Sequence, residues 1–236
     1  MPWIVPSVIP LPPDFTAFDP GSSIPCDTFS SYTRHLPHWR LPHAAYFVTF
    51  RLADSIPRAT LAEIQREAEE WRNKGPLSDL ELEEWREFQR GRLRKLERLL
   101  DEGHGECLLR ESKNRQAVVK ALHHFEGERT EMLAYVVMPN HVHVLCRLRG
   151  GFELEKACRS WKSFTGRNIQ HHLGRKGTLW QDENFDRIIR DEAHYQATVR
   201  YIAKNPLKAG LQEHEASVWF CKSIQDANSQ TPRRDI

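Results

Sequence analysis

The chain has 236 residues and a mass of 27.6 kDa, with 39% hydrophobic and 28% charged residues. A mean hydropathy of −0.63, with no apolar run near the ~18 residues that a membrane helix needs, excludes an integral membrane protein. Five cysteines without a Cys-x-x-Cys pair exclude a disulfide scaffold, and the net charge of +2 does not by itself identify a nucleic-acid binder. The start has no basic leader pattern, so we expect a cytoplasmic protein.

The N-terminal part of the chain, 1–42, holds nine of the 14 prolines. Proline fixes φ and removes a backbone donor, so we expect an extended, irregular arm. The run 45–52 is rich in aromatic and β-branched residues and predicts the first strand. Two helices follow, the second opened by a capping box of Ser78 and Glu81. We interpret this pair, over 57–104, as a helical hairpin inserted between the first strand and the rest of the sheet.

The remaining elements alternate between helices and short strands. In chain order we expect a helix over 114–125, strands over 132–138 and 141–147, a helix over 153–173, an edge strand over 185–190 and a helix over 191–204. Only two residues separate the two central strands, which makes them antiparallel neighbours. The Asn205-Pro206 pair is expected to end the last helix.

This order of elements predicts an α+β sandwich with helices on one face of the sheet. The body spans 43–222, and a polar tail follows over 223–236.

His141 and His143 are the sharpest chemical feature of the sequence. They lie two residues apart in a predicted strand, so both imidazoles project from one face while Val142 and Val144 project from the other. Two imidazoles from one strand can bind a divalent ion together with one further ligand. The same spacing also arises by chance, although a half-buried strand gains little from adjacent imidazoles unless something ligates them.

Tyr201 and Asn205 form the second feature. They stand four residues apart in a predicted helix and therefore share one face. A tyrosine phenol is a poor nucleophile when protonated, but it becomes useful when a metal polarises the electrophile. An asparagine carbonyl oxygen can serve as a hard ligand. The alternative is that Tyr201 is a core residue and that Asn205 only ends the helix.

Six stretches follow one another in an order that a known family shares. They are Phe-Val-Thr-Phe-Arg-Leu (47–52), Tyr-Val-Val-Met-Pro-Asn-His-Val-His-Val-Leu (135–145), Trp-Lys-Ser-Phe-Thr (161–165), Leu-Trp-Gln (179–181), Phe-Asp-Arg-Ile-Ile-Arg-Asp-Glu (185–192) and Tyr-Ile-Ala-Lys-Asn-Pro-Leu-Lys-Ala-Gly-Leu (201–211). Together they resemble the HUH single-tyrosine transposases, and specifically the REP-associated tyrosine transposases of bacteria.

The resemblance implies a ferredoxin-like antiparallel sheet with both histidines on a central strand. It further implies that His141, His143 and Asn205 bind Mg²⁺ or Mn²⁺ and that Tyr201 is the nucleophile. The family cuts single-stranded DNA beside small hairpins, forming a 5′-phosphotyrosine and a free 3′-hydroxyl that can rejoin strands. The expected partner is single-stranded or hairpin DNA of the REP type, bound by a monomer or a homodimer.

Basic residues gather in the later half of the chain. The segment 155–208 has 11 Lys and Arg against six Asp and Glu, whereas 57–105 has ten against 12. The residues expected to contact DNA phosphates are Arg159, Lys162, Arg167, Arg175, Lys176, Arg187, Arg190 and Lys208. Such contacts weaken as the salt concentration rises. The alternative is that these side chains only form a solvated face.

Two other functions stay open at this point. The first is a domesticated regulator that binds hairpin DNA without transposing it, and the second is an unrelated metallo-hydrolase that uses the two histidines and a carboxylate. All four key positions carry residues suited to the chemistry, which favours the enzyme over the regulator.

Overall fold

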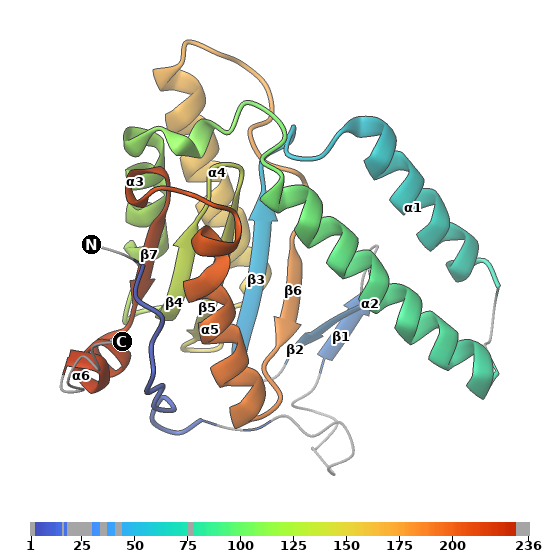
Figure 1. Ribbon diagram of the computed structural model, residues 1–236, viewed down its shortest axis with the longest axis horizontal. Helices are drawn as coiled ribbons and strands as arrows, with labels where there is room; N and C mark the ends of the chain where they lie inside the picture. Colours follow the sequence, from blue (N-terminus) through green and yellow to red (C-terminus); the bar gives the residue numbers. More distant parts are fainter. Residues whose placement is uncertain are drawn as a thin grey trace.

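The computed structural model describes residues 3–15, 17, 30–33, 37–40, 44–74 and 78–229. Its body is a five-stranded antiparallel sheet in the order β6-β3-β5-β4-β7 (Figure 1). The strands are β3 (Ala45–Arg51), β4 (Thr130–Val137), β5 (His141–Leu148), β6 (Phe185–Ile188) and β7 (Ser217–Phe220). Helices pack on this sheet, so the predicted α+β class is confirmed.

Strand β5 lies at the centre of the sheet and carries both histidines. Its register with β3 places Arg51 opposite His141 and Thr49 opposite His143. On its other edge it pairs with β4, and the turn between them is closed by a 2.9 Å hydrogen bond from the Met138 N–H to the His141 carbonyl. Because backbone bonds fix β5 on both edges, its side chains are held in defined positions.

The first face of the sheet is covered by α3 (Ser112–His123) and α4 (Leu154–His172). Val142 and Val144 belong to this core, as expected for residues opposite the histidines. Phe50 of β3 stacks on Trp161 of α4, with ring centroids 6.4 Å apart, and meets the edge of Trp180 at 4.9 Å.

The second face is covered by α5 (Glu192–Lys208), which corrects the prediction that helices cover one face only. The central strands are buried on both sides, so their second apolar face also needs a cover. Val199 and Ile202 of α5 supply it by packing in one core with Phe47 and Leu145.

Helix α5 also continues beyond the predicted stop at Asn205-Pro206 and ends at Lys208. A proline in the last turn removes only its own donor, and the turn is closed by bonds from Ala209 N–H to the Asn205 carbonyl (3.1 Å) and from Leu211 N–H to the Pro206 carbonyl (2.9 Å). The asparagine therefore lies within the helix, with helical backbone on both sides.

The predicted helical hairpin is present as α1 (Arg58–Arg72) and α2 (Asp79–Asp101). The Ser78 capping box forms as expected: the Ser78 hydroxyl accepts from the Glu81 N–H and the Glu81 carboxylate accepts from the Ser78 N–H. The sequence also predicts that Gly75 and Pro76 end the first helix, but both residues lie outside the described part of the chain. Figure 1 shows α2 crossing the edge of the sheet formed by β6 and β3.

The hairpin has a small apolar core of its own, distinct from the two cores of the sheet. Its buried members are Ile56, Ile64, Leu99 and Leu100.

The chain ends differ from their predictions. The expected polar tail begins with a helix, α6 (Lys222–Ser229), because Ile224 is buried in the second core. The Asn228 side chain accepts from the backbone of Ser7 and Val8 and so ties this helix to the N-terminal segment. Figure 1 shows that segment running past β7 and α5 toward α6.

The expected irregular arm also contains a two-stranded ladder, formed by β1 (Ser30–Thr33) and β2 (Pro37–Arg40). Pro37 takes the first position of its strand, where a proline is tolerated.

Two 3₁₀ turns, Leu108–Arg110 and Glu213–Glu215, complete the described secondary structure. None of the described helices is both long enough and apolar enough to cross a membrane.

The separate core of the hairpin predicts that Ile64→Ala loosens α1 and α2 alone. Removing this buried side chain costs about 2–5 kcal/mol, but only in the cluster to which it belongs. Native-state hydrogen exchange should then speed up in both hairpin helices and stay unchanged in β3, β5 and α5. The matched change Leu122→Ala in the first core should lower protection throughout the sheet. Equal loss of protection everywhere in Ile64→Ala would show that the hairpin unfolds together with the sheet.

Candidate active site

The structure brings the two histidines together as predicted. His141 and His143 project from the same face of β5 and are 1% and 2% exposed. Their Nε2 atoms lie 3.1 Å apart. Two ligand atoms at right angles around one ion, each about 2.1 Å from it, are separated by about 3 Å. The spacing therefore suits a shared divalent cation.

The outer nitrogen of each ring has a fixed partner. His141 Nδ1 lies 2.7 Å from the amide oxygen of Asn140, whose own amide nitrogen donates to the carbonyls of Leu100 (3.2 Å) and His104 (3.3 Å). Asn140 must therefore accept, so His141 carries its proton on Nδ1 and presents a bare Nε2. His143 Nδ1 lies 2.7 Å from the Thr49 hydroxyl, which can donate or accept. A cation between the Nε2 atoms would select the tautomer that donates to Thr49.

Both imidazoles are neutral in the folded chain. Burial lowers the pKa of His141 to about 3, with a smaller opposing effect of Asn205. Burial also lowers the pKa of His143 well below its usual value. Neutral imidazole is the form that binds metal ions.

Tyr201 reaches the same place from α5. Its hydroxyl lies 3.4 Å from His143 Nε2, and its ring meets that of Phe47 edge-on at a centroid distance of 5.8 Å. Burial raises the pKa of Tyr201, and the charge of Glu97 raises it further. The phenol is therefore protonated at rest, and its proton has to leave during any nucleophilic attack.

Asn205 follows Tyr201 by one helical turn and is 1% exposed. It lies beside His141 and Tyr201 and influences the pKa of both. Neither its amide nitrogen nor its amide oxygen has a hydrogen-bond partner among the described residues. A buried polar group without a partner costs about 1–3 kcal/mol, so this amide is suited to a ligand that the chain itself does not supply.

These donors fit a divalent cation. Among the described residues, no group of three His, Cys, Asp and Glu side chains is placed to hold a metal ion. The amide oxygen of Asn205, which has no hydrogen-bond partner among those residues, is a hard oxygen donor beside the two imidazoles. Nitrogen and oxygen donors of this kind suit Mn²⁺, whereas Mg²⁺ prefers oxygen ligands.

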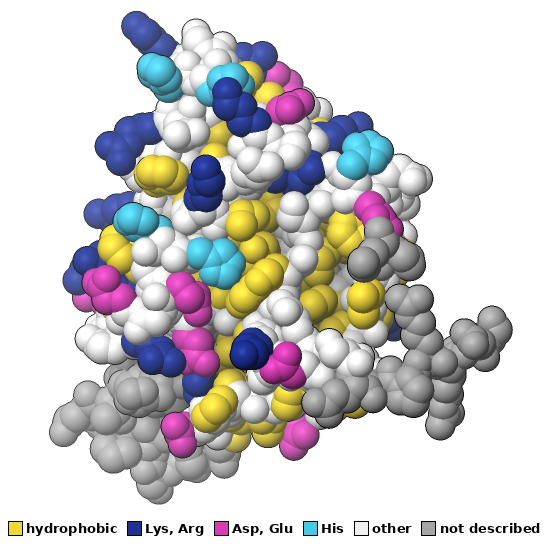
Figure 2. Space-filling model, turned by 90° about the vertical axis from the view of Figure 1, so that its left-hand side faces the viewer, with side chains coloured by type: hydrophobic (Ala, Val, Ile, Leu, Met, Phe, Trp, Pro, Cys, Tyr) yellow, Lys and Arg dark blue, Asp and Glu magenta, His cyan; other side chains and the backbone are white. Residues whose placement is uncertain are grey.

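The basic residues predicted to contact DNA lie in two regions. Those of α4 and the loop after it, Arg159, Lys162, Arg167, Arg175 and Lys176, lie along or near a groove of about 730 Å³ between α4 and residues 177–184. The remaining three, Arg187, Arg190 and Lys208, lie on β6, just after it and at the end of α5. The face at the β7 side of the molecule carries side chains of both charge signs (Figure 2).

Several of these basic side chains already have protein partners. Lys162 donates to the carbonyl of Gln181 at 2.9 Å and so anchors the loop, while Arg175 pairs with Glu106 at 2.6 Å. Lys208 pairs with Asp101 of α2 at 2.9 Å.

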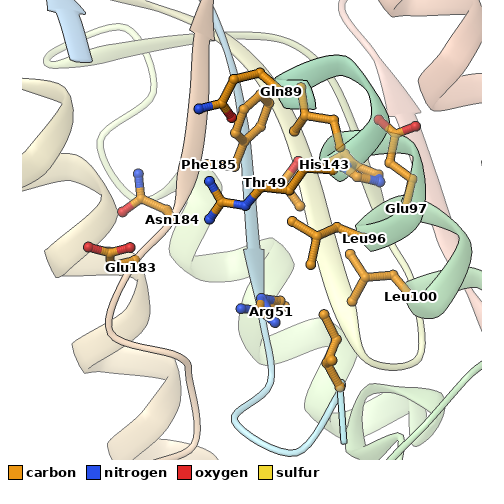
Figure 3. A pocket seen from close by; sticks show the side chains of 13 residues that line it. Thr49, Arg51, Gln89, Leu96, Glu97, Leu100, His143, Glu183, Asn184 and Phe185 are labelled. Carbon is orange, nitrogen blue, oxygen red and sulfur yellow. Dashed lines mark hydrogen bonds between the residues drawn. The ribbon is translucent and has the colours of Figure 1, made fainter. Parts of the chain in front are cut away.

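The sequence did not indicate that α2 covers the histidine face. A pocket next to His143 is lined by Gln89, Leu96 and Glu97 of this helix, as Figure 3 shows. One signal was available, since Glu97 interrupts an apolar stripe of Leu93, Leu96 and Leu100. Burial raises the pKa of Glu97, while Arg187 and Lys208 act in the opposite direction.

With this geometry in hand, the comparisons with known proteins are informative. Residues 109–205 match the family model described as Transposase IS200 like. This segment is similar to the IS200-like transposases. The matched part of the chain runs from the 3₁₀ turn before α3 to Asn205 and so contains both histidines and Tyr201, which confirms the resemblance. The hairpin of α1 and α2 lies outside it.

One similar solved structure is that of a REP-associated tyrosine transposase bound to a REP hairpin. The two share 19% identity, with 78% of this chain and 76% of that chain covered and a TM-score of 0.42. No curated protein matches this sequence.

Without a metal ion, the stability of this protein should fall as the pH drops from about 6.5 to 5. In the unfolded chain the histidines take up protons near pH 6.5, whereas burial keeps His141 and His143 neutral in the fold. The unfolded state then binds more protons, and each imidazole removes about 1.4 kcal/mol per pH unit, with full stability present above pH 6.5.

Urea unfolding in the presence of a chelator measures this dependence. His143→Gln should reduce the slope of the unfolding free energy against pH by the contribution of one imidazole, about 1.4 kcal/mol per pH unit. An identical slope in His143→Gln would contradict the assignment.

Proposed function

We propose that this protein is a metal-dependent enzyme that nicks single-stranded DNA and transfers strands, with Tyr201 as its nucleophile. The observation that carries the proposal is the position of the Tyr201 hydroxyl, 3.4 Å from one of two adjacent, buried imidazoles. A phosphate held at the imidazole pair would lie within reach of this oxygen.

In this proposal His141, His143 and Asn205 hold Mg²⁺ or Mn²⁺. The ion supplies Lewis-acid chemistry, by neutralising charge on the scissile phosphate. Thr49 and Asn140 orient the two rings through their outer nitrogens.

The Tyr201 oxygen attacks the phosphorus atom as the bond from phosphorus to the 3′-oxygen breaks. The phenolic proton is lost to solvent, and the departing 3′-oxygen takes up a proton to become a free hydroxyl. The enzyme is left with a 5′-phosphotyrosine.

The buried site serves the second half of the reaction. The phosphotyrosine keeps the energy of the phosphodiester, so a 3′-hydroxyl can attack it and rejoin strands without a base that activates water. Phe47 and the apolar residues of α2 limit the access of water to this bond.

The proposed substrate is single-stranded DNA next to a REP-type hairpin. Arg159, Arg167 and Lys176 are exposed at or near the α4 groove and supply positive charge for the DNA backbone. The nucleophile and the ligands come from one chain, so the proposed chemistry does not require a second copy.

Tyr201→Phe should abolish the covalent link between protein and DNA, because it removes the attacking oxygen. Cleavage of a labelled single-stranded hairpin substrate with Mn²⁺ should fall by at least about 10³-fold, as expected for loss of a nucleophile. The adduct is measured by denaturing electrophoresis. Tyr195→Phe is the matched control, since Tyr195 lies two turns earlier on α5 in the apolar core.

Each outcome of this experiment has a clear meaning. An adduct that persists in Tyr201→Phe would exclude this nucleophile. Free 5′-phosphate released by Tyr201→Phe would favour the metallo-hydrolase, and hairpin binding without cleavage under any divalent ion would favour the regulator.

Replacing the proposed ligands should remove metal binding while leaving DNA binding intact. His141→Ala leaves one imidazole, so Mn²⁺ affinity measured by calorimetry should drop by more than about 100-fold, and Asn205→Ala should lower it by about tenfold or more. His124→Ala is the control, because its imidazole is exposed and away from the pair. Unchanged Mn²⁺ affinity in His141→Ala would rule out this site.

A further inference from the structure

The pocket beside the imidazoles has a volume of about 120 Å³ and lies between the sheet and α2. Figure 3 shows Arg51 at its floor, between Glu183 on one side and Leu100 on the other. Its polar lining comes from Thr49, Arg51, Gln89, Arg92, Glu97, His143, Glu183 and Asn184. None of these side chains apart from His143 and Thr49 has a part in the nicking chemistry proposed above.

Arg51 lies on the strand next to the imidazole pair, directly across from His141. It follows Thr49 by two residues on β3, so both side chains lie on the face that carries the histidines. Thr49 contacts His143, and Arg51 is the register partner of His141. Neighbouring strands lie about 4.8 Å apart, so the backbone of Arg51 lies directly beside that of His141.

Arg51 and Arg92 meet at this pocket from opposite sides, one from β3 and the other from α2. The Nη1 atom of Arg51 is buried and has no hydrogen-bond partner among the described residues. Burial lowers the pKa of Arg51 to about 10, the neighbouring charge of Arg92 lowers it as well, and Glu183 only partly offsets them. Two guanidinium groups so placed favour an added anion.

Two carboxylates also line the pocket. Glu183 is the acidic group that acts on Arg51, whereas Glu97 interacts with Arg187 and Lys208. The planar fork of a guanidinium matches two phosphate oxygens, and its hydrogen bonds to an anion are about twice as strong as neutral ones.

We propose that Arg51 and Arg92 bind the DNA phosphate that neighbours the scissile one. This inference rests on the proposed function, since its ligand is the backbone of the DNA on which the enzyme acts. The contact fixes the register of the strand, so that the next phosphate lies between the imidazoles and Tyr201. It also makes the inserted hairpin part of the DNA site, because α2 supplies Arg92.

The test measures DNA binding without cleavage, in the Tyr201→Phe background and with a chelator present. The probe is a fluorescein-labelled DNA hairpin of the REP type with a single-stranded flank, and its anisotropy gives the affinity at several salt concentrations. A plot of log affinity against log salt concentration has a negative slope. For single strands, this slope becomes shallower by about 0.7 for each phosphate that the protein no longer neutralises. Arg51→Gln and Arg92→Gln should each make the slope shallower by this amount and lower the affinity for the probe by roughly tenfold.

Two further variants separate charge from shape. Arg51→Lys keeps the charge, so it should keep the slope while binding less tightly than the fork of the arginine. Arg90→Gln is the matched control, because Arg90 lies on the same helix but is exposed and pairs with Glu83. It should leave the slope unchanged.

The melting temperature of the DNA-free protein checks for a merely structural role. Arg51→Gln relieves the repulsion between two guanidinium groups, so it should melt no lower than the parent protein, and a lower melting temperature would overturn the inference.

In the binding experiment, a reduced affinity with an unchanged salt slope would indicate a base contact and would also overturn the inference. If the parent binds the probe and Arg51→Gln binds equally well, only this inference fails. If the parent does not bind at any salt concentration, the proposed function fails with it.

Discussion

Two imidazole nitrogens held 3.1 Å apart in a buried site are the constraint on which this structure depends. Without water, such a pair needs either a shared proton or a shared cation, since two bare lone pairs repel each other at low dielectric. The chain holds the rings in place through Asn140 and Thr49, and it fixes their strand by backbone pairing on both edges. Because the rings are held in this way, their Nε2 atoms already point toward each other in the chain without a ligand.

The second face of the sheet brings the other reactive groups to this pair. Val199 and Ile202 dock α5 on the strands, and the same helix then directs Tyr201 and Asn205 toward the imidazoles. The continuation of the helix past Pro206 keeps Asn205 in regular backbone and carries Lys208 to its ion pair with Asp101. The apolar packing that holds α5 on the sheet therefore also fixes the positions of Tyr201 and Asn205 beside the imidazoles.

The parts that followed from the sequence are those set by local periodicity. The alternation of a strand places His141 and His143 on one face, and the period of a helix places Tyr201 above Asn205. The parts that did not follow depend on packing between distant segments. No local pattern shows that α5 takes the second face, that Ile224 pulls the tail into a helix, or that α2 lies over the histidines. The exception is Glu97, whose place in an apolar stripe was visible in the sequence.

The hairpin has its own small core, yet one of its helices forms a wall beside the reactive groups. A wall built in this way can change its surface residues over evolutionary time without disturbing the sheet that holds the imidazoles. Among relatives with different insertions, the shape of the cleft would then diverge while the reaction is conserved.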